Sequence, residues 1–162
     1  MLPEKMNEAM NEQVAKEFYA EYLYLSMAVE FAEKSLDGFA NWFFKQAEEE
    51  HEHAMKFIEF ILERGRKVVV PAIPKPNFEA KEYIDYFKAA LEHEKYVTNS
   101  INGLMNLAIE LKDHASKSLL QWFVDEQVEE EDSVGTIVDH LELIGDSRNG
   151  IFMLDRELGK RE

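Results

Sequence analysis

The sequence of 162 residues contains no cysteine, and this absence excludes several kinds of site. Without thiols the chain can form no disulfide, no zinc-thiolate site, no iron-sulfur cluster and no cysteine nucleophile. Basic residues are also few, because 18 lysines and arginines stand against 33 acidic residues and give a formal net charge of -15. With no basic cluster against that background, nucleic acid is not expected as a partner. No apolar run approaches the ~20 residues that span a bilayer, so we expect a soluble cytoplasmic protein without a membrane partner.

Helix breakers are scarce as well. The four prolines and seven glycines mostly separate long stretches rich in Glu, Lys, Leu, Met and Ala. These residues are good helix formers, so the sequence predicts an all-α fold. The length suits one domain, residues 1–162, with one core. We expect four long helices and a short fifth one, over residues 4–34, 39–64, 79–111, 114–144 and 149–158.

The segment Lys67–Asn77 stands apart from these helical stretches. It contains three prolines and three consecutive valines, which favour extended backbone over helix. About 13 extended residues reach roughly 43 Å, and a helix of about 28 residues is roughly 42 Å long. The segment can therefore run the whole length of a bundle. A simple up-down-up-down bundle needs only a short turn here, so we expect one long crossover that makes the second and third helices parallel.

Each of the four predicted long helices has polar or acidic residues within the apolar stripe that should face the core. A single glutamate on a helix is most often a surface residue, but here the same departure recurs in every helix. In chain order the inward polar residues are Glu17, the Glu-x-x-His pair Glu50 and His53, Glu94, and the pair Gln127 and Glu130.

The numbering also places these residues at one depth. Residues equidistant from a hairpin turn lie at the same height in two antiparallel helices. Glu17 and His53 mirror each other across residue 35, and Glu94 and Glu130 mirror each other across residue 112. We therefore expect both hairpins to bring their acids into one layer at the middle of the bundle.

Such a layer needs positive charge. Burying an uncompensated carboxylate costs several kcal/mol, and like charges at close range drive one another to protonate. The neighbouring inward positions hold no lysine or arginine, so metal ions are the best source of compensation. Four carboxylates balance two divalent cations, and Glu and His ligands without sulfur suit iron or manganese, with Glu50 placed to bridge them. Zinc could bind but would carry out no redox chemistry.

The segments Glu17–Tyr24, Glu48–His53 and Leu120–Glu130, together with Glu94, resemble the haem-free bacterial ferritins over essentially the whole chain. The resemblance implies a ferritin-like four-helix bundle with one long crossover between the second and third helices and a short fifth helix. Bacterioferritins differ in two ways that matter here. They carry a second Glu-x-x-His on the fourth helix, where this chain has Gln127-Val-Glu-Glu130. Their haem-ligating methionine corresponds to Glu52 in this chain, so we expect no haem.

The resemblance also implies roles for individual residues. Glu17, Glu50 and His53 would hold one iron, and Glu50, Glu94 and Glu130 the other. Gln127 would lie near the pair, and Tyr24 would support the site or donate an electron. A third iron site would consist of Glu49, Glu126, Glu129 and again Glu130; the alternative for the first three of these is a solvated acidic face.

As the resemblance implies, the protein is a ferroxidase. Two ferrous ions bind, dioxygen or hydrogen peroxide is reduced, and the ferric product moves to a mineral core inside a hollow homo-oligomeric shell of 24 subunits. Two alternatives stay open. One is a di-iron oxidase or peroxidase without mineral storage. The other is a non-catalytic helical assembly protein whose inward acids are protonated and hydrogen-bonded to Tyr24 and Gln127.

Two further expectations concern residues outside the layer. Ile151, Phe152 and Leu154 give the short fifth helix more apolar surface than a lone tail needs. By resemblance this helix packs between subunits, and the alternative is that it docks on its own bundle. The remaining histidines have no mirrored partners in the inward stripes and are interpreted as surface residues; they are His51, His93, His114 and His140.

Overall fold

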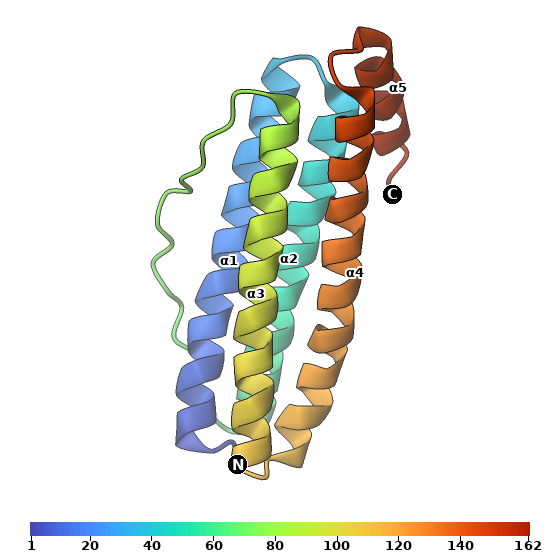
Figure 1. Ribbon diagram of the computed structural model, residues 1–162. Coiled ribbons are helices and arrows are strands. Elements are labelled where there is room, and N and C mark those ends of the chain that lie inside the picture. Colours follow the sequence, from blue (N-terminus) through green and yellow to red (C-terminus); the bar gives the residue numbers. More distant parts are fainter.

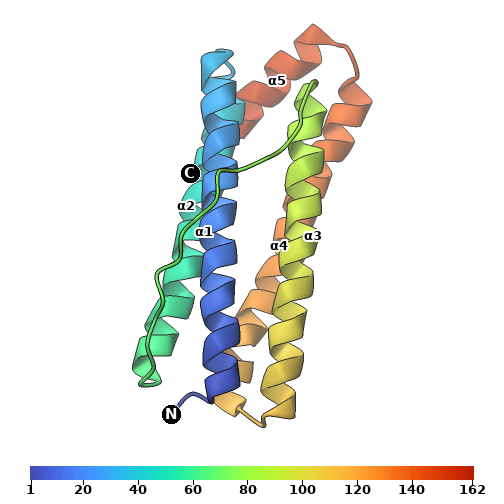
Figure 2. The same cartoon turned by 90° about the vertical axis from the view of Figure 1, so that its left-hand side faces the viewer.

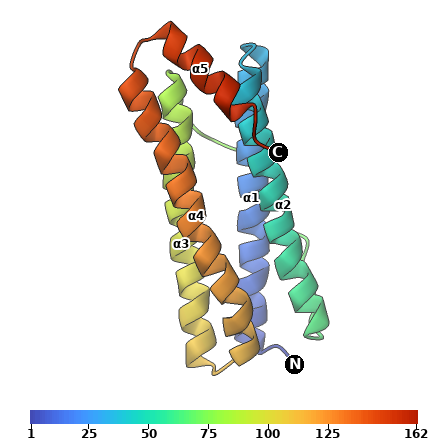
Figure 3. The same ribbon diagram turned by 90° about the vertical axis from the view of Figure 1, so that its right-hand side faces the viewer.

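The computed structural model describes residues 1–162 as five helices without strands (Figure 1). The helices are α1 (Glu4–Glu33), α2 (Asp37–Glu63), α3 (Tyr83–Glu110), α4 (His114–Ile144) and α5 (Arg148–Leu158). The first four run side by side as a bundle, and α5 lies across one end of it (Figures 1 and 3). The all-α prediction is confirmed. None of the five helices has the length and apolarity required to cross a membrane.

The predicted long crossover is present. Residues 64–82 leave the end of α2, run along α1 and enter α3 at the opposite end of the bundle (Figure 2). Asn11 of α1 fixes the start of this segment, because its side chain accepts a hydrogen bond from the Val69 backbone N–H (2.6 Å) and donates one to the Lys67 carbonyl (3.2 Å). α2 and α3 are therefore parallel, which is the ferritin-like connection.

Helix α3 begins at Tyr83, later than the predicted start at residue 79. The cause is a capping box. The Asp85 carboxylate accepts hydrogen bonds from the backbone N–H groups of Lys81 and Glu82, both at 2.9 Å, and Glu82 is the N-cap residue. These bonds satisfy N–H groups at the helix start and fix the chain outside the helix before Tyr83.

Both hairpin turns use a residue other than glycine in the left-handed region. Ser35 follows α1 with φ 58° and Lys112 follows α3 with φ 53°. At the first turn the Leu36 N–H donates to the Phe31 carbonyl (3.1 Å), and at the second the Asp113 N–H donates to the Ala108 carbonyl (2.9 Å). This pattern closes each helix with a Schellman motif. Ser35 and Lys112 are also the two residues across which the inward acids are mirrored.

The apolar core has two parts with a polar layer between them. One cluster of 20 buried residues fills the end of the bundle near α5, and one of 12 fills the opposite end. In every long helix, buried polar residues lie between the two clusters or at their inner edges, and buried Ser116, near the start of α4, lies outside this region. This layer consists of Gln13, Glu17, Gln46, Glu50, His53, Glu94, Gln127 and Glu130.

Helix α5 docks on the bundle of its own chain. Leu154 and Leu158 are buried in the larger cluster, and the Asp155 carboxylate accepts hydrogen bonds from the backbone N–H groups of Gly38 (2.9 Å) and Phe39 (3.0 Å). Thus Leu154, assigned above to a contact between subunits, packs within the subunit. Phe152 keeps 62% of its surface exposed, so only part of the apolar surface of α5 is used here.

Candidate metal centre

The structure gathers the six inward residues that the sequence analysis singled out. All are buried, with exposed fractions of 1% to 5%, and they come from all four long helices. The set comprises Glu17, Glu50, His53, Glu94, Gln127 and Glu130. The depth argument is therefore correct about where these side chains meet, although their role as metal ligands is a separate question.

Glu17, Glu50 and His53 form the first close group. One potential ligand atom from each residue lies within 4.8 Å of the others. Glu17 Oε1 accepts a hydrogen bond from the Gln13 amide at 2.8 Å, but Glu17 Oε2 is buried without any partner. A buried carboxylate oxygen without a donor is costly, and a cation between these three residues would remove that cost.

Glu94 and Glu130 lie on the other hairpin. The Tyr24 hydroxyl donates to Glu94 Oε1, and the Gln127 amide donates to Glu94 Oε2 at 3.1 Å. The Gln46 amide donates to Glu130 Oε2 at 2.5 Å and reaches toward Glu50 Oε1 at 3.5 Å. Gln46 thereby links the two hairpins across the layer.

Burial raises the pKa of every carboxyl group in the layer. It raises the pKa of Glu17 and Glu94 to about 7 and that of Glu130 to about 8. The pKa of Glu50 is also raised well above its ordinary value, by burial first and then by the neighbouring carboxylates. Without cations the layer therefore holds protons at neutral pH, and cations that bind there replace them.

Burial has the opposite effect on His53. It lowers the pKa of this imidazole to about 4, with a smaller contribution from Lys56, so the ring is neutral at pH 7. His53 Nδ1 lies 3.3 Å from Glu50 Oε2. A neutral imidazole beside carboxylates is a suitable ligand for a divalent transition metal.

The residues of the expected third site are brought together only in part. One potential ligand atom each of His53, Glu126 and Glu130 lies within 4.8 Å of the others. Burial, followed by the charges of Glu129 and Glu49, raises the pKa of Glu126. Glu129 is exposed and belongs to neither close group, while Glu49 is half-exposed and pairs with Arg161.

Sequence reasoning missed two glutamines and one arginine. Gln13 and Gln46 are buried in the layer, each four residues before an inward glutamate, Glu17 and Glu50. Residues four apart share a helix face, so this spacing was a usable signal. Arg161 comes from beyond α5, and no helical spacing could have placed it beside the layer.

His93 corrects the surface interpretation of the remaining histidines. The other three are exposed, but His93 is half-buried, with its Nε2 enclosed and without a partner. Its ring centre lies 5.7 Å from that of Tyr19 and 6.1 Å from that of Tyr24. Burial lowers the pKa of His93 to about 4. Its position next to Glu94 on a helix turns it partly inward, toward α1.

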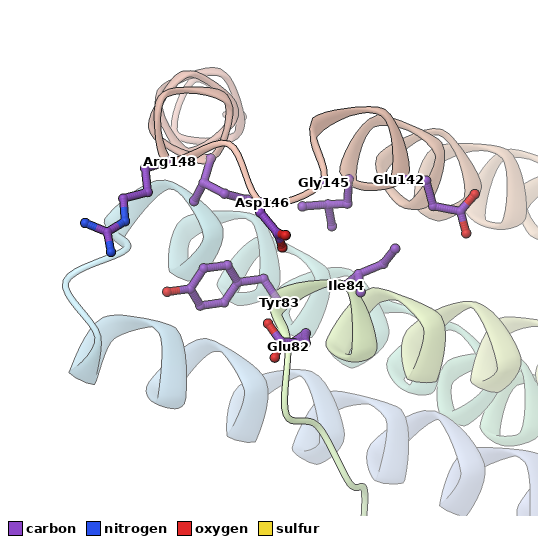
Figure 4. Close-up of a pocket in the computed structure, with 9 residues that line it drawn as sticks. Glu82, Tyr83, Ile84, Glu142, Gly145, Asp146 and Arg148 are labelled. Atoms are coloured by element: carbon purple, nitrogen blue, oxygen red, sulfur yellow. The ribbon is translucent and has the colours of Figure 1, made fainter.

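A cavity of about 620 Å³ lies away from the layer, at the end of the bundle where α3 begins and α4 ends (Figure 4). Glu82 and Tyr83 line it from one side, and Asp146 of the connection between α4 and α5 and Arg148 of α5 line it from the other. None of the residues that line it belongs to the carboxylate layer, so it is not the entrance to the candidate metal centre.

Known proteins with related sequences and structures agree with this arrangement. The ferritin-like domain family matches residues 7–144. The bacterial non-heme ferritin of Staphylococcus saprophyticus is 40% identical over 161 residues, which is 99% of this chain and 96% of that protein. Its counterpart in Staphylococcus epidermidis is 38% identical over 161 residues, which cover 99% and 97% of the two chains.

Solved structures give the same result. An open pore ferritin from the hyperthermophilic archaeon Archaeoglobus fulgidus superposes with a TM-score of 0.97 at 44% identity, covering 99% of this chain and 98% of that one. A humanized archaeal ferritin gives a TM-score of 0.98 at 44% identity, with 100% and 98% of the chains covered. With the crossover, the carboxylate layer and these relatives in agreement, the chain belongs to the ferritin family.

Proposed function

We propose that this ferritin subunit stores iron and is a ferroxidase, which oxidises its ferrous substrate in the carboxylate layer. The observation that carries the proposal is Glu17 Oε2, a buried carboxylate oxygen without a partner beside Glu50 and His53. Glu17, Glu50 and His53 would hold one ferrous ion. Glu50, Glu94 and Glu130 would hold the second, with Glu50 shared between the two.

The chemistry follows from the charge of this layer. Two ferrous ions give up one electron each, and dioxygen takes up both electrons with two protons to form hydrogen peroxide, or hydrogen peroxide takes them up to form water. Glutamate ligands that have lost their protons stabilise ferric iron more than ferrous iron, which favours oxidation. The protons that ferrous binding displaces from the layer are available for the reduced oxygen.

Tyr24 and Gln127 orient Glu94 through hydrogen bonds to its two carboxylate oxygens. These bonds, together with the raised pKa values of the carboxyl groups, favour the non-catalytic assembly protein, in which the acids would be protonated and structural. That alternative would leave Glu17 Oε2 without an amide or hydroxyl donor from any other residue, and only a proton shared with Glu50 would link it to a neighbour. The oxidation site therefore explains more of the layer.

Storage requires an enclosed space, so we further propose that the chain forms a hollow homo-oligomeric shell of 24 subunits. The support is the close similarity to ferritins over nearly the full chain. Glu126 beside Glu130 and His53, with Glu49 and Glu129 nearby, would take up a third iron on its way from the oxidation site. A mineral-storing shell distinguishes this function from a di-iron oxidase that acts on another substrate.

The test is aerobic addition of ferrous iron to the iron-free protein, followed by the absorbance of ferric products. The wild type should oxidise iron rapidly and retain far more than two ions per chain. A Glu50→Ala, Glu130→Ala double variant should oxidise it on the order of 10- to 100-fold more slowly. A Glu48→Ala, Asp139→Ala variant, matched in the number of acids lost, should keep most of the rate. If wild type and double variant both oxidise iron no faster than buffer, the proposal is wrong.

A further inference from the structure

Arg161, close to the C-terminus, lies at the edge of the carboxylate layer. α5 runs from the end of α4 across to α2, and the C-terminus lies beside α2 (Figure 3). The Arg161 guanidinium stacks over the Trp42 ring with its Cζ 4.8 Å from the ring centre, and its Nη1 donates to the Trp42 carbonyl at 3.2 Å. The Arg161 carbonyl accepts a hydrogen bond from Asn41 at 3.0 Å. The residue is thus held by its backbone and by its side chain.

The same guanidinium contacts two residues of the metal-centre region. Nη1 donates to Gln46 Oε1 at 3.0 Å, and Nη2 donates to Glu49 Oε2 at 2.5 Å. Since the Gln46 oxygen accepts from arginine, its amide nitrogen is directed toward Glu130, where it donates at 2.5 Å. Arg161 is therefore two hydrogen bonds from a carboxylate assigned to the oxidation site.

Glu49 lies on the side of the layer where a third cation would bind. Its charge contributes to the raised pKa of both Glu126 and Glu130, which form a close group with His53. Arg161 is the base that pairs with Glu49, and the Arg161 side chain is only 23% exposed. A planar guanidinium that binds Glu49 and Gln46 at once is more firmly placed than a surface lysine would be.

We propose that Arg161 is a built-in counter-ion that withholds Glu49 from the close group of His53, Glu126 and Glu130, so that a third cation must displace the C-terminal arginine to gain Glu49 as a ligand. The inference rests on the proposed function of the layer. Its consequence is a weakened third site, which favours passage of iron over retention. The ligands proposed for the two cations of the oxidation site do not include Glu49, so those cations would not be subject to this competition.

The experiment is anaerobic calorimetric titration of the assembled, iron-free protein with Zn²⁺, which binds the same ligand types without redox chemistry. Wild type should bind two Zn²⁺ tightly per chain and a third weakly. Arg161→Gln should strengthen the third site by about three- to tenfold, the range expected for loss of one partly buried ion pair. Adding Glu49→Gln to Arg161→Gln should remove this gain.

Lys160→Gln is the matched control, because it removes a neighbouring positive charge that pairs with Glu157 rather than with the layer. It should leave all three affinities unchanged. Anomalous diffraction at the zinc edge should show a peak beside Glu49 that is stronger in Arg161→Gln than in wild type. An unchanged third site in Arg161→Gln, an equal gain in Lys160→Gln, or a gain that survives Glu49→Gln would each overturn the inference. Absence of the two tight sites in wild type would instead contradict the proposed function.

Discussion

Glu17 is the only carboxylate of the layer with a buried oxygen that lacks a hydrogen-bond partner. Without a cation, a proton held by Glu50 is the only link between that oxygen and its neighbours. A fold selected only for stability would place an apolar or amide side chain here. The cation binding that we propose would explain the residue, and its cost to the metal-free protein should be measurable.

The pH dependence of stability provides that measurement. The folded-state pKa values of Glu17 and Glu94 are about 7 and that of Glu130 is about 8, against 4.5 in the unfolded chain. A raised folded-state pKa stabilises the fold fully below the unfolded-state value, and this stabilisation is lost as the pH rises through the folded-state value. The free energy of unfolding of the metal-free protein should therefore fall between pH 6.5 and 8.

The two buried or half-buried histidines affect the stability mainly outside this pH range. His53 and His93 have folded-state pKa values of about 4 and ordinary values of 6.5, so their effect on stability is confined mainly to lower pH. Guanidinium unfolding across the window tests the prediction. Glu17→Gln should reduce the slope, whereas Glu12→Gln, an exposed control on the same helix, should not. Saturating Zn²⁺ should remove the fall, since it binds the deprotonated carboxylates. Stability that rose with pH in the metal-free protein would contradict the buried-carboxylate account.

At the level of the helices, the two hairpin turns set the depth at which the acids meet. Both turns were predicted from local sequence, and the mirror relation across residues 35 and 112 was sufficient to place the layer. The left-handed backbone of Ser35 and Lys112 was not predictable, because neither residue favours that conformation. The Schellman hydrogen bonds and the packing of the hairpins hold these residues there.

Lys112→Gly should therefore stabilise the protein. Glycine adopts φ 53° without the steric cost that lysine bears, although it also adds entropy to the unfolded chain. The net gain should be about 0.5–1 kcal/mol in guanidinium unfolding. Gly65→Ala is the reverse control, because Gly65 has φ 73° after α2, and it should destabilise by a similar amount. A loss of stability in Lys112→Gly would show that the lysine side chain has a role in the turn that its exposure does not suggest.

Helix α5 supplies a cap that α2 lacks. The N-cap residue of α2, Leu36, has no side-chain acceptor, and Asp155 of α5 accepts from the Gly38 and Phe39 N–H groups in its place. Asp155→Ala should cost about 1–2 kcal/mol, the usual value of a lost cap with its charge at the positive end of a helix. Asp155→Asn should cost less, and Asp139→Ala, which removes an exposed acid from α4, should cost little. Equal stability in all three variants would mean that the Asp155 cap contributes nothing to the stability of the bundle.

For the whole molecule, the crossover and the four acidic interruptions were the informative parts of the sequence. The proline-rich segment was long enough to span a bundle, and that required α2 and α3 to be parallel. Features that depend on how the helices pack together were not predicted. The position of Arg161 depends on how α5 crosses the bundle end, and the partial burial of His93 depends on the packing of α3 against α1. Periodicity along one helix carries neither kind of information.

The measurement that tests the central claim most directly is the crystal structure of the assembled protein loaded anaerobically with ferrous iron, with anomalous diffraction at the iron edge. The account predicts two strong iron peaks in each subunit. One lies among Glu17, Glu50 and His53, and the other among Glu50, Glu94 and Glu130. A carboxylate layer that stayed free of iron while iron bound only to surface acids would contradict it.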